Sequence, residues 1–215
     1  MVSIQQAISI LGLHRLQAII LTLALRDMLA MARHEPMLRS CWRHNLGAAL
    51  VAEAVAGWVE VDRPDADSAG LLHELGRLAM IGGAPRQYGA VLERVKRGEG
   101  TLDDAERDVF GAHQSEVGEW LAEGWGLPSQ LREAVSGIPE TAESAWSLVK
   151  IARWSCSASD RLGFVLSGPP PEWDAAAMVG SLPVCLRSAV QPEVSRWREV
   201  VTAGVAAFER DFIGR

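Results

Sequence analysis

Apolar residues recur every three or four positions along most of the chain, which is the spacing of one face of an α-helix. The strict alternation of apolar and polar residues that marks a half-buried strand is nearly absent. Ser, Thr and Pro at helix starts and Gly at helix ends divide the pattern into successive elements. We therefore predict an all-α protein, with helices at about residues 4–11, 13–32, 36–59, 67–82, 85–97, 101–125, 129–136, 142–162, 172–179, 183–190 and 192–212.

The stretch Ser-Gly-Pro-Pro-Pro at residues 167–171 is the clearest break in this helical pattern. It divides the chain into a helical core, residues 1–165, and a linker with a C-terminal helical extension, residues 166–215. The helix predicted at 13–32 is apolar on nearly all sides, so we expect it to be buried.

Charge and composition exclude several classes of protein. The 215 residues carry a net charge of −6, which disfavours a nucleic-acid binder because such a protein needs a basic face to displace counterions. The most apolar run, residues 18–25, is too short to cross a membrane, and the N-terminus lacks the features of a signal peptide. The three cysteines are too scattered for a zinc knuckle or a disulfide framework. We expect a cytoplasmic protein without a membrane partner.

Three of the five histidines lie on three different predicted helices. His44 lies in CWRHN, His73 in LLHELG and His113 in FGAHQSEVGEWL, and Glu74 follows His73 directly. A single histidine on an apolar helix face is usually a core residue with one hydrogen bond. Three histidines and an acid on separate helices instead favour a shared site, because metal sites in helical bundles are built from side chains that project inward.

These segments, together with SIQQAISILGLHRL and GLLHELGRLAM and in this order, resemble the HDOD domain. This domain is a bacterial relative of the HD metal-dependent phosphohydrolases and of the HD-GYP cyclic-dinucleotide phosphodiesterases. The resemblance covers about residues 2–162. It implies an HD-like helical bundle that usually lacks the full set of metal ligands and is thought to act as a signalling output or scaffold.

The resemblance assigns the family's metal-binding pattern to His44, to the pair His73–Glu74, and to His113. The family's adjacent histidine pair would fall at residues 136–138, which read Ser-Gly-Ile. The family's final aspartate would fall near Arg153. We therefore interpret these residues as the remnant of a metal site.

The chemistry of such a site supports this interpretation. A dinuclear centre needs enough carboxylate and imidazole ligands to offset about four positive charges, and a guanidinium repels cations. No cofactor is expected, and we predict instead a buried network in which Glu74 pairs with Arg153. A single zinc ion held by the three histidines and Glu74 stays open as an alternative.

The resemblance and the missing ligands together predict a non-catalytic signalling or regulatory module that binds protein partners. One alternative is a metal-dependent phosphohydrolase or cyclic-dinucleotide phosphodiesterase. Another is a nucleotide-binding sensor without catalysis, in which Arg153 and Arg43 contact phosphate.

Tryptophan and glycine positions add expectations about packing. The resemblance implies that Trp120 and Trp125 are core residues, and Trp173 and Trp197 are expected to pack the extension onto the core. Glycines within the predicted helices indicate close helix–helix approach: Gly76, Gly111 and Gly118.

HDOD domains usually have a block of helices before the segment that resembles SIQQAISILG, whereas this chain starts on that segment. The apolar helices at residues 4–11 and 13–32 would then lack their cover. We expect a homodimer through these helices, or a gene start that lies further upstream, rather than cover by the C-terminal extension.

Overall fold

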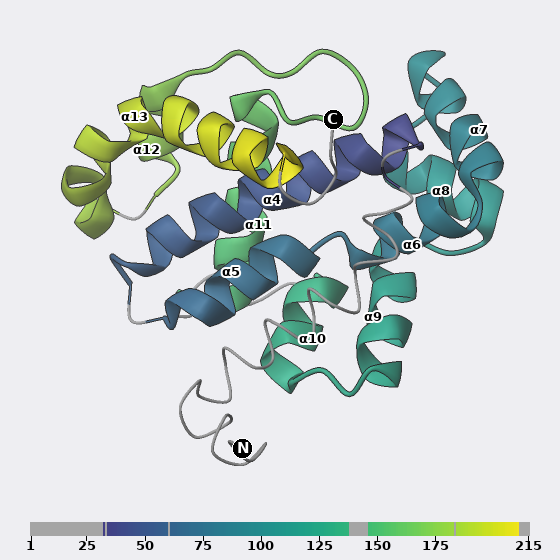
Figure 1. Cartoon of the computed structure of the whole chain (residues 1–215), viewed down its shortest axis with the longest axis horizontal. Coiled ribbons are helices and arrows are strands. Elements are labelled where there is room, and N and C mark those ends of the chain that lie inside the picture. The colour runs from purple at the N-terminus through teal and green to yellow at the C-terminus, as the bar shows by residue number, and fades with distance from the viewer. Residues whose placement is uncertain (1–31, 33, 60, 138–145, 183, 211–215) are drawn as a thin grey trace.

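The computed structural model describes residues 32, 34–59, 61–137, 146–182 and 184–210, and every regular element among them is helical. Within these ranges, no helix has both the length and the apolar character needed to cross a membrane. The helices of Figure 1 are α4 (Pro36–Ala56), α5 (Arg63–Leu72), α6 (Leu75–Gly83), α7 (Pro85–Lys96), α8 (Leu102–Phe110), α9 (Gln114–Gly124), α10 (Ser129–Ser136), α11 (Leu148–Leu162), α12 (Ala175–Gly180) and α13 (Val184–Phe208).

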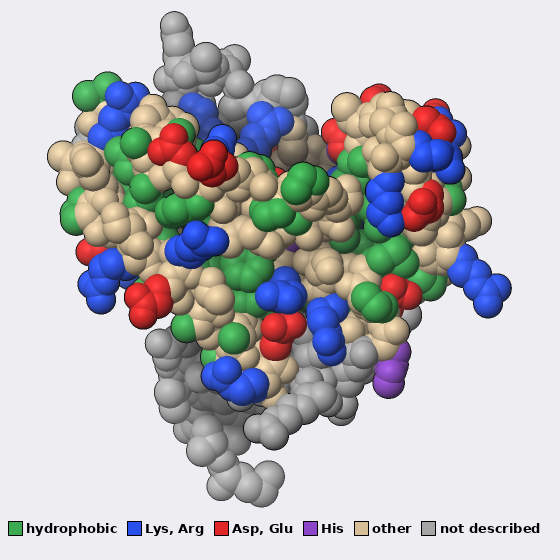
Figure 2. Space-filling view, turned by 90° about the horizontal axis from the view of Figure 1, so that it is seen from above, with side chains coloured by type: hydrophobic (Ala, Val, Ile, Leu, Met, Phe, Trp, Pro, Cys, Tyr) green, Lys and Arg blue, Asp and Glu red, His purple; other side chains and the backbone are tan. Residues whose placement is uncertain are grey.

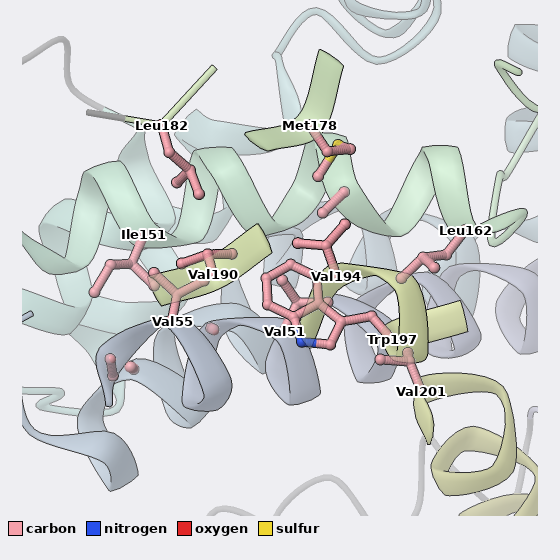
Figure 3. Close-up of a cluster of buried hydrophobic side chains, with 14 of the residues drawn as sticks. Val51, Val55, Ile151, Leu162, Met178, Leu182, Val190, Val194, Trp197 and Val201 are labelled. Atoms are coloured by element: carbon pink, nitrogen blue, oxygen red, sulfur yellow. The ribbon is translucent and has the colours of Figure 1, made fainter. Parts of the chain in front are cut away.

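Helix α4 is the central element of the fold. Helices α5, α11 and α13 pack along it, α6 to α9 extend from one end, and α10 lies between α5, α9 and α11 (Figure 1). One hydrophobic cluster fills the space between α4, α11, α12 and α13 (Figure 3). A second cluster joins α4 to the helices α6 to α9. The candidate site residues lie on elements that this packing brings together.

The C-terminal extension shares the first hydrophobic cluster with the core. Trp197 on α13 is 5% exposed. Its ring centroid lies 6.0 Å from that of Trp58 and 5.7 Å from that of Trp154 on α11. The half-buried Trp173 packs against the same cluster. The predicted packing of Trp173 and Trp197 onto the core is confirmed. The dimer prediction rests on the helices at residues 4–11 and 13–32, of which the structure describes Ala32 alone.

The predicted division into helices is wrong at three places, and the helix starts predicted at 67 and 142 lie at 63 and 148. The helix predicted at 101–125 is two helices, because Gly111 adopts the left-handed conformation (φ +72°) and ends α8, after which His113 caps α9. Gly111 therefore ends a helix and does not mark a close helix approach. At the C-terminal end, Pro192 lies inside a continuous α13, so the two helices predicted there are one.

The third wrong boundary is the break between α5 and α6, which falls on the motif LLHELGRL. His73 follows the end of α5 and Glu74 precedes α6, so neither lies in mid-helix. In a continuous helix the Gly70 carbonyl would accept the N–H of Glu74. Here that carbonyl accepts a 2.7 Å hydrogen bond from Nδ1 of His73. A side chain that bonds the backbone in this way competes with the helix.

Gly76 and Gly118 allow α6 and α9 to pack closely, as predicted. A Cβ atom on Gly76 would lie 1.8 Å from the Gln114 carbonyl oxygen and 2.6 Å from the Gly118 nitrogen. Only glycine fits at such a contact. This contact fixes the junction that carries His73 and Glu74 against the N-terminal end of α9.

Trp120 and Trp125 do not lie in the core. Their side chains are 63% and 44% exposed, because they lie on the outer side and at the end of α9 while Gly118 and Ala122 face inward. On another face of the molecule, basic and acidic side chains are interspersed (Figure 2).

Candidate functional site

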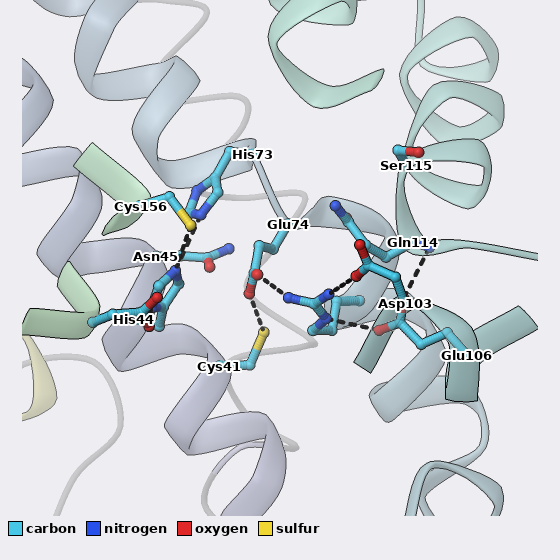
Figure 4. A network of polar contacts seen from close by, with 12 residues as sticks. Cys41, His44, Asn45, His73, Glu74, Asp103, Glu106, Gln114, Ser115 and Cys156 are labelled. Atoms are coloured by element: carbon cyan, nitrogen blue, oxygen red, sulfur yellow. Dashed lines mark hydrogen bonds and ion pairs between the residues drawn. The ribbon is translucent and has the colours of Figure 1, made fainter. Parts of the chain in front are cut away.

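Two histidines from distant parts of the chain meet beneath the α5–α6 junction (Figure 4). Nε2 of His44, on α4, lies 3.1 Å from Nε2 of His73. Helix α11 adds Cys156, whose Sγ lies 3.5 Å from Nε2 of His44. A carboxylate oxygen of Glu74 completes the group, and the four donor atoms all lie within 4.8 Å of one another. The predicted proximity of His44, His73 and Glu74 is therefore seen, with Cys156 as a fourth member.

The outer nitrogens of both rings bind acceptors. Nδ1 of His44 lies 2.7 Å from the Phe164 carbonyl oxygen and 3.3 Å from a carboxylate oxygen of Asp160. Nδ1 of His73 lies 2.7 Å from the Gly70 carbonyl oxygen. Because these oxygens only accept, both Nδ1 atoms carry a proton. In the neutral rings the two Nε2 atoms are then unprotonated, and their lone pairs face one another.

The protein environment shifts the pKa values of the two rings in opposite directions. Burial lowers the pKa of His73 to about 3. Burial alone would also lower the pKa of His44, but hydrogen bonds to Asp160 and Cys156 outweigh it and raise that pKa to about 10. Without another cation, a proton on Nε2 of His44 therefore bridges the two rings at neutral pH.

Glu74 pairs with Arg77, not with Arg153. Arg77 forms an ion pair with Oε1 of Glu74, and its Nε donates a 2.8 Å hydrogen bond to Glu106. The hydroxyl of Tyr88 donates to the same Glu106 oxygen over 2.6 Å, and the Cys41 thiol donates to Oε2 of Glu74 over 3.7 Å. Although burial would lower the pKa of Arg77, Tyr88 and Glu106 keep it above its ordinary value. The predicted buried ionic network exists, but Arg77 is its cation.

Arg153 is exposed and donates a 2.6 Å hydrogen bond to the Gly137 carbonyl oxygen. The predicted pair of Glu74 with Arg153 is therefore wrong. Arg153 lies on the same face of α11 as Cys156 and Asp160 and lines the same cavity as they do, but its guanidinium bonds Gly137 while Arg77 takes the place beside Glu74. Arg43 lies apart from these residues, 3.9 Å from Glu209 and over the ring of Phe164.

His113 belongs to a second group of polar side chains. Its Nδ1 accepts the Ser115 backbone N–H over 3.2 Å, and its Nε2 lies 3.0 Å from Asp103 and 3.9 Å from Glu106. The backbone N–H of His113 donates to Glu116, which completes a capping box at the start of α9. The expectation that His113 shares a metal with His44 and His73 does not agree with this geometry.

A cavity of about 430 Å³ connects the two groups. Its acidic lining residues are Glu74, Asp103 and Asp160, and its basic ones are Arg77 and Arg153. Arg43 is not among the residues that line it. Since the charge of Arg77 is already balanced by Glu74 and Glu106, the cavity offers Arg153 as its remaining guanidinium against two further carboxylates.

The positions of these side chains determine how many metal ions the two groups can hold. Two ions would need bridging carboxylates, but the guanidinium of Arg77 lies between Glu74 on one side and Glu106 and Asp103 on the other. A permanent cation therefore stands where a second ion would have to be. The residues do not fit a dinuclear centre. The group His44, His73, Cys156 and Glu74 does have the number and type of donors for one ion.

A family model of the HDOD domain matches residues 1–138. The chain belongs to the HDOD domain family. The fold of this HDOD protein resembles the crystal structure, at 1.90 Å resolution, of an HDOD domain protein of unknown function from Geobacter sulfurreducens, with a TM-score of 0.67. The two sequences are 21% identical, and the similarity covers 98% of this chain and 74% of the other. No curated protein matches the chain.

Several residues of the site were not identified from the sequence. Arg77 follows Glu74 by three residues, a spacing that is typical of ion pairs in helical segments. Glu106 follows Arg77 by 29 residues, and only the tertiary fold brings these two side chains together. Cys156 and Asp160 are spaced by four, which puts them on one face of α11. The spacing of Cys156 and Asp160 is a sequence signal for a shared helix face, whereas no sequence signal indicates that Cys41 contacts Glu74.

Proposed function

We propose that this HDOD protein is a non-catalytic signalling or regulatory module that acts by binding a protein partner. The observation that carries the proposal is the position of Arg77 between Glu74 and Glu106. Phosphodiester hydrolysis at a two-metal site depends on metal-bound water and on two ions that clamp the reacting oxygens. An internal guanidinium supplies fixed charge and no activated water. The remnant of the metal site therefore stabilises the fold and does not hydrolyse a substrate.

Two alternatives have less support. A phosphohydrolase with two metal ions would need a second ion between Glu74 and Glu106, and the guanidinium of Arg77 already lies between these two carboxylates. A nucleotide sensor that uses Arg43 and Arg153 would need both guanidinium groups in one cavity, and only Arg153 lines it. An anionic ligand there would also face Asp103 and Asp160.

The exposed tryptophans of α9 support a protein partner. Trp120 and Trp125 are the two exposed tryptophans among the large exposed apolar side chains of the described residues. Tryptophan is enriched among the residues that dominate binding energy at protein interfaces. Glu119 and Glu123 lie beside Trp120 along α9, so we propose that the partner presents apolar and basic side chains. A cytoplasmic location is part of this proposal, because the free thiols of Cys41 and Cys156 suit a reducing compartment.

The partner proposal can be tested by crosslinking in the native cell, followed by measurement of binding with the purified partner. Trp120→Ala is expected to weaken binding at least tenfold. Val184→Ala removes another exposed apolar side chain, 76% exposed on α13, and is expected to leave binding unchanged. A partner whose affinity is the same for both variants would contradict a binding surface on α9, and a chain for which no specific partner binds would contradict the proposed function.

A further inference from the structure

We propose that His44, His73 and Cys156 bind a single zinc ion, with a carboxylate oxygen of Glu74 as the fourth ligand. This set differs from the one expected from the sequence, because a thiolate from α11 takes the place of His113. The proposal does not depend on a protein partner.

The distances between the donor atoms agree with a tetrahedral zinc site. Zinc binds imidazole nitrogen at about 2.0–2.1 Å and thiolate sulfur at about 2.3 Å, which places two nitrogens about 3.3 Å apart and a nitrogen and a sulfur about 3.6 Å apart. The observed separations are 3.1 Å for the two Nε2 atoms and 3.5 Å for Nε2 of His44 and Sγ of Cys156. The ring nitrogens and the sulfur are therefore already near the corners of such a site.

The direction of the Nε2 lone pairs of His44 and His73 is a second, independent observation in favour of a zinc site. Both Nδ1 atoms donate to oxygens, so both Nε2 lone pairs point into the same small volume. Two lone pairs at this separation need a cation between them. A proton on one ring serves this purpose for the pair, but only a metal ion also engages the sulfur and the carboxylate that converge there.

Three of the four ligands are also held by an outer partner, as is usual at metal sites. Asp160 and the Phe164 carbonyl hold the ring of His44, and the Gly70 carbonyl holds the ring of His73. Arg77 binds Oε1 of Glu74, which leaves lone pairs of Oε2 for a metal. This arrangement suits a single ion with protein ligands at every position.

The ion would join three separate parts of the fold. His44 lies on α4, Cys156 on α11, and His73 with Glu74 at the α5–α6 junction. Binding would release two protons to solvent, the thiol proton of Cys156 and the Nε2 proton of His44. Zinc would therefore stabilise the arrangement of these helices, and its availability would regulate the module.

The first test is elemental analysis of the full chain, purified with a tag that contains no histidine and without chelator. The expected result is one zinc ion per chain. After removal of the metal, added zinc is expected to raise the melting temperature. A chain that carries no zinc and whose melting temperature does not respond to zinc would overturn the proposal.

Variants distinguish this ligand set from the one that includes His113. Cys156→Ser and His73→Ala are expected to weaken zinc binding more than about 100-fold, and Asp160→Asn about 10- to 100-fold through the ring of His44. With Co²⁺ as a probe, the sulfur-to-metal charge-transfer band should be absent in Cys156→Ser. The control is His113→Asn, which keeps a capping side chain and should bind zinc like the wild type.

Two results would contradict the ligand set. One is zinc binding that survives Cys156→Ser, and the other is zinc binding that is lost in His113→Asn in a protein that retains its helical circular dichroism. Because the readouts are metal content and spectra, a failure here is distinct from the discovery of enzymatic turnover, which would overturn the proposed function.

Discussion

Nε of Arg77 donates a 2.8 Å hydrogen bond to Oε1 of Glu106, whose side chain is fully buried. This ion pair and the adjacent pair of Arg77 with Glu74 join α6 to α8 beneath the cavity. The charges are away from water, so each depends on its partner. Loss of one member leaves an uncompensated charge in the interior.

Arg77→Met is expected to lower the free energy of unfolding by about 3–5 kcal/mol, because Glu74 and Glu106 lose their common cation. The control is Arg94→Met, since Arg94 pairs with Asp108 over the same 2.8 Å but with side chains 35% and 57% exposed. An exposed pair is worth about 0–1 kcal/mol. Denaturant unfolding measures the free energy of unfolding of both variants. Equal losses of this free energy would show that the Arg77 network is not a buried one.

Gly76→Ala is expected to destabilise the fold by about 1–3 kcal/mol or more, because the new methyl group would meet the backbone of α9. Gly83, in the same helix, has no neighbouring atom within 4 Å of the position that a methyl group would occupy, and Gly83→Ala should stay within about 1 kcal/mol of the wild type. Thermal unfolding of the two variants measures the difference. A tolerated Gly76→Ala would mean that α6 and α9 are further apart.

Asp67, on α5, predicts a dependence of stability on pH. Burial, followed by repulsion from Glu53, raises the pKa of its carboxyl to about 6. The folded state thus holds this proton more tightly than the unfolded chain, so the free energy of unfolding falls as the pH rises from about 4 through 6.

Asp67→Asn should remove this dependence. At pH 7 the variant is expected to be more stable than the wild type by up to about 3 kcal/mol, since one pKa unit corresponds to about 1.4 kcal/mol, and the difference should vanish below about pH 4. Glu53→Gln should produce a smaller change in the same direction. Unfolding curves at several pH values check this, and parallel pH profiles for wild type and Asp67→Asn would refute it.

Self-association through residues 4–32 stays a prediction, because Ile8 and Ile20 lie outside the described residues. Light scattering is expected to give about twice the 23.3 kDa chain mass for the wild type and one chain mass for Ile8→Asp and Ile20→Asp. Val184→Asp, at an exposed position of α13, should remain a dimer. A monomeric wild type would contradict the prediction.

Local sequence signals were sufficient for many helix boundaries. Pro36 and Pro85 open α4 and α7, Thr101 and Asp104 form the capping box of α8, and Ser129 starts α10 as expected. These signals act within one turn of a helix, so they do not depend on the rest of the fold.

The break at His73 could not be predicted in this way. The ring of His73 bonds the Gly70 carbonyl while it is held against His44, 29 residues earlier on α4. The family resemblance places Glu74 and Arg153 at one site and so predicts Arg153 as the partner of Glu74. The nearer Arg77 pairs with Glu74 instead, since α6 carries it into the space between α8 and the α5–α6 junction. Exposure of Trp120 likewise depends on how α9 is oriented by Gly118.

The most direct test of the central claim is the rate of cyclic-dinucleotide hydrolysis by the purified full chain with added Mn²⁺, Fe²⁺ or Zn²⁺, compared with that of His73→Ala. Since the guanidinium of Arg77 lies between Glu74 and Glu106, where a second metal ion would have to bind, we predict that both proteins hydrolyse the substrate no faster than buffer with metal alone. Metal-dependent turnover by the wild type that is abolished in His73→Ala would contradict this prediction.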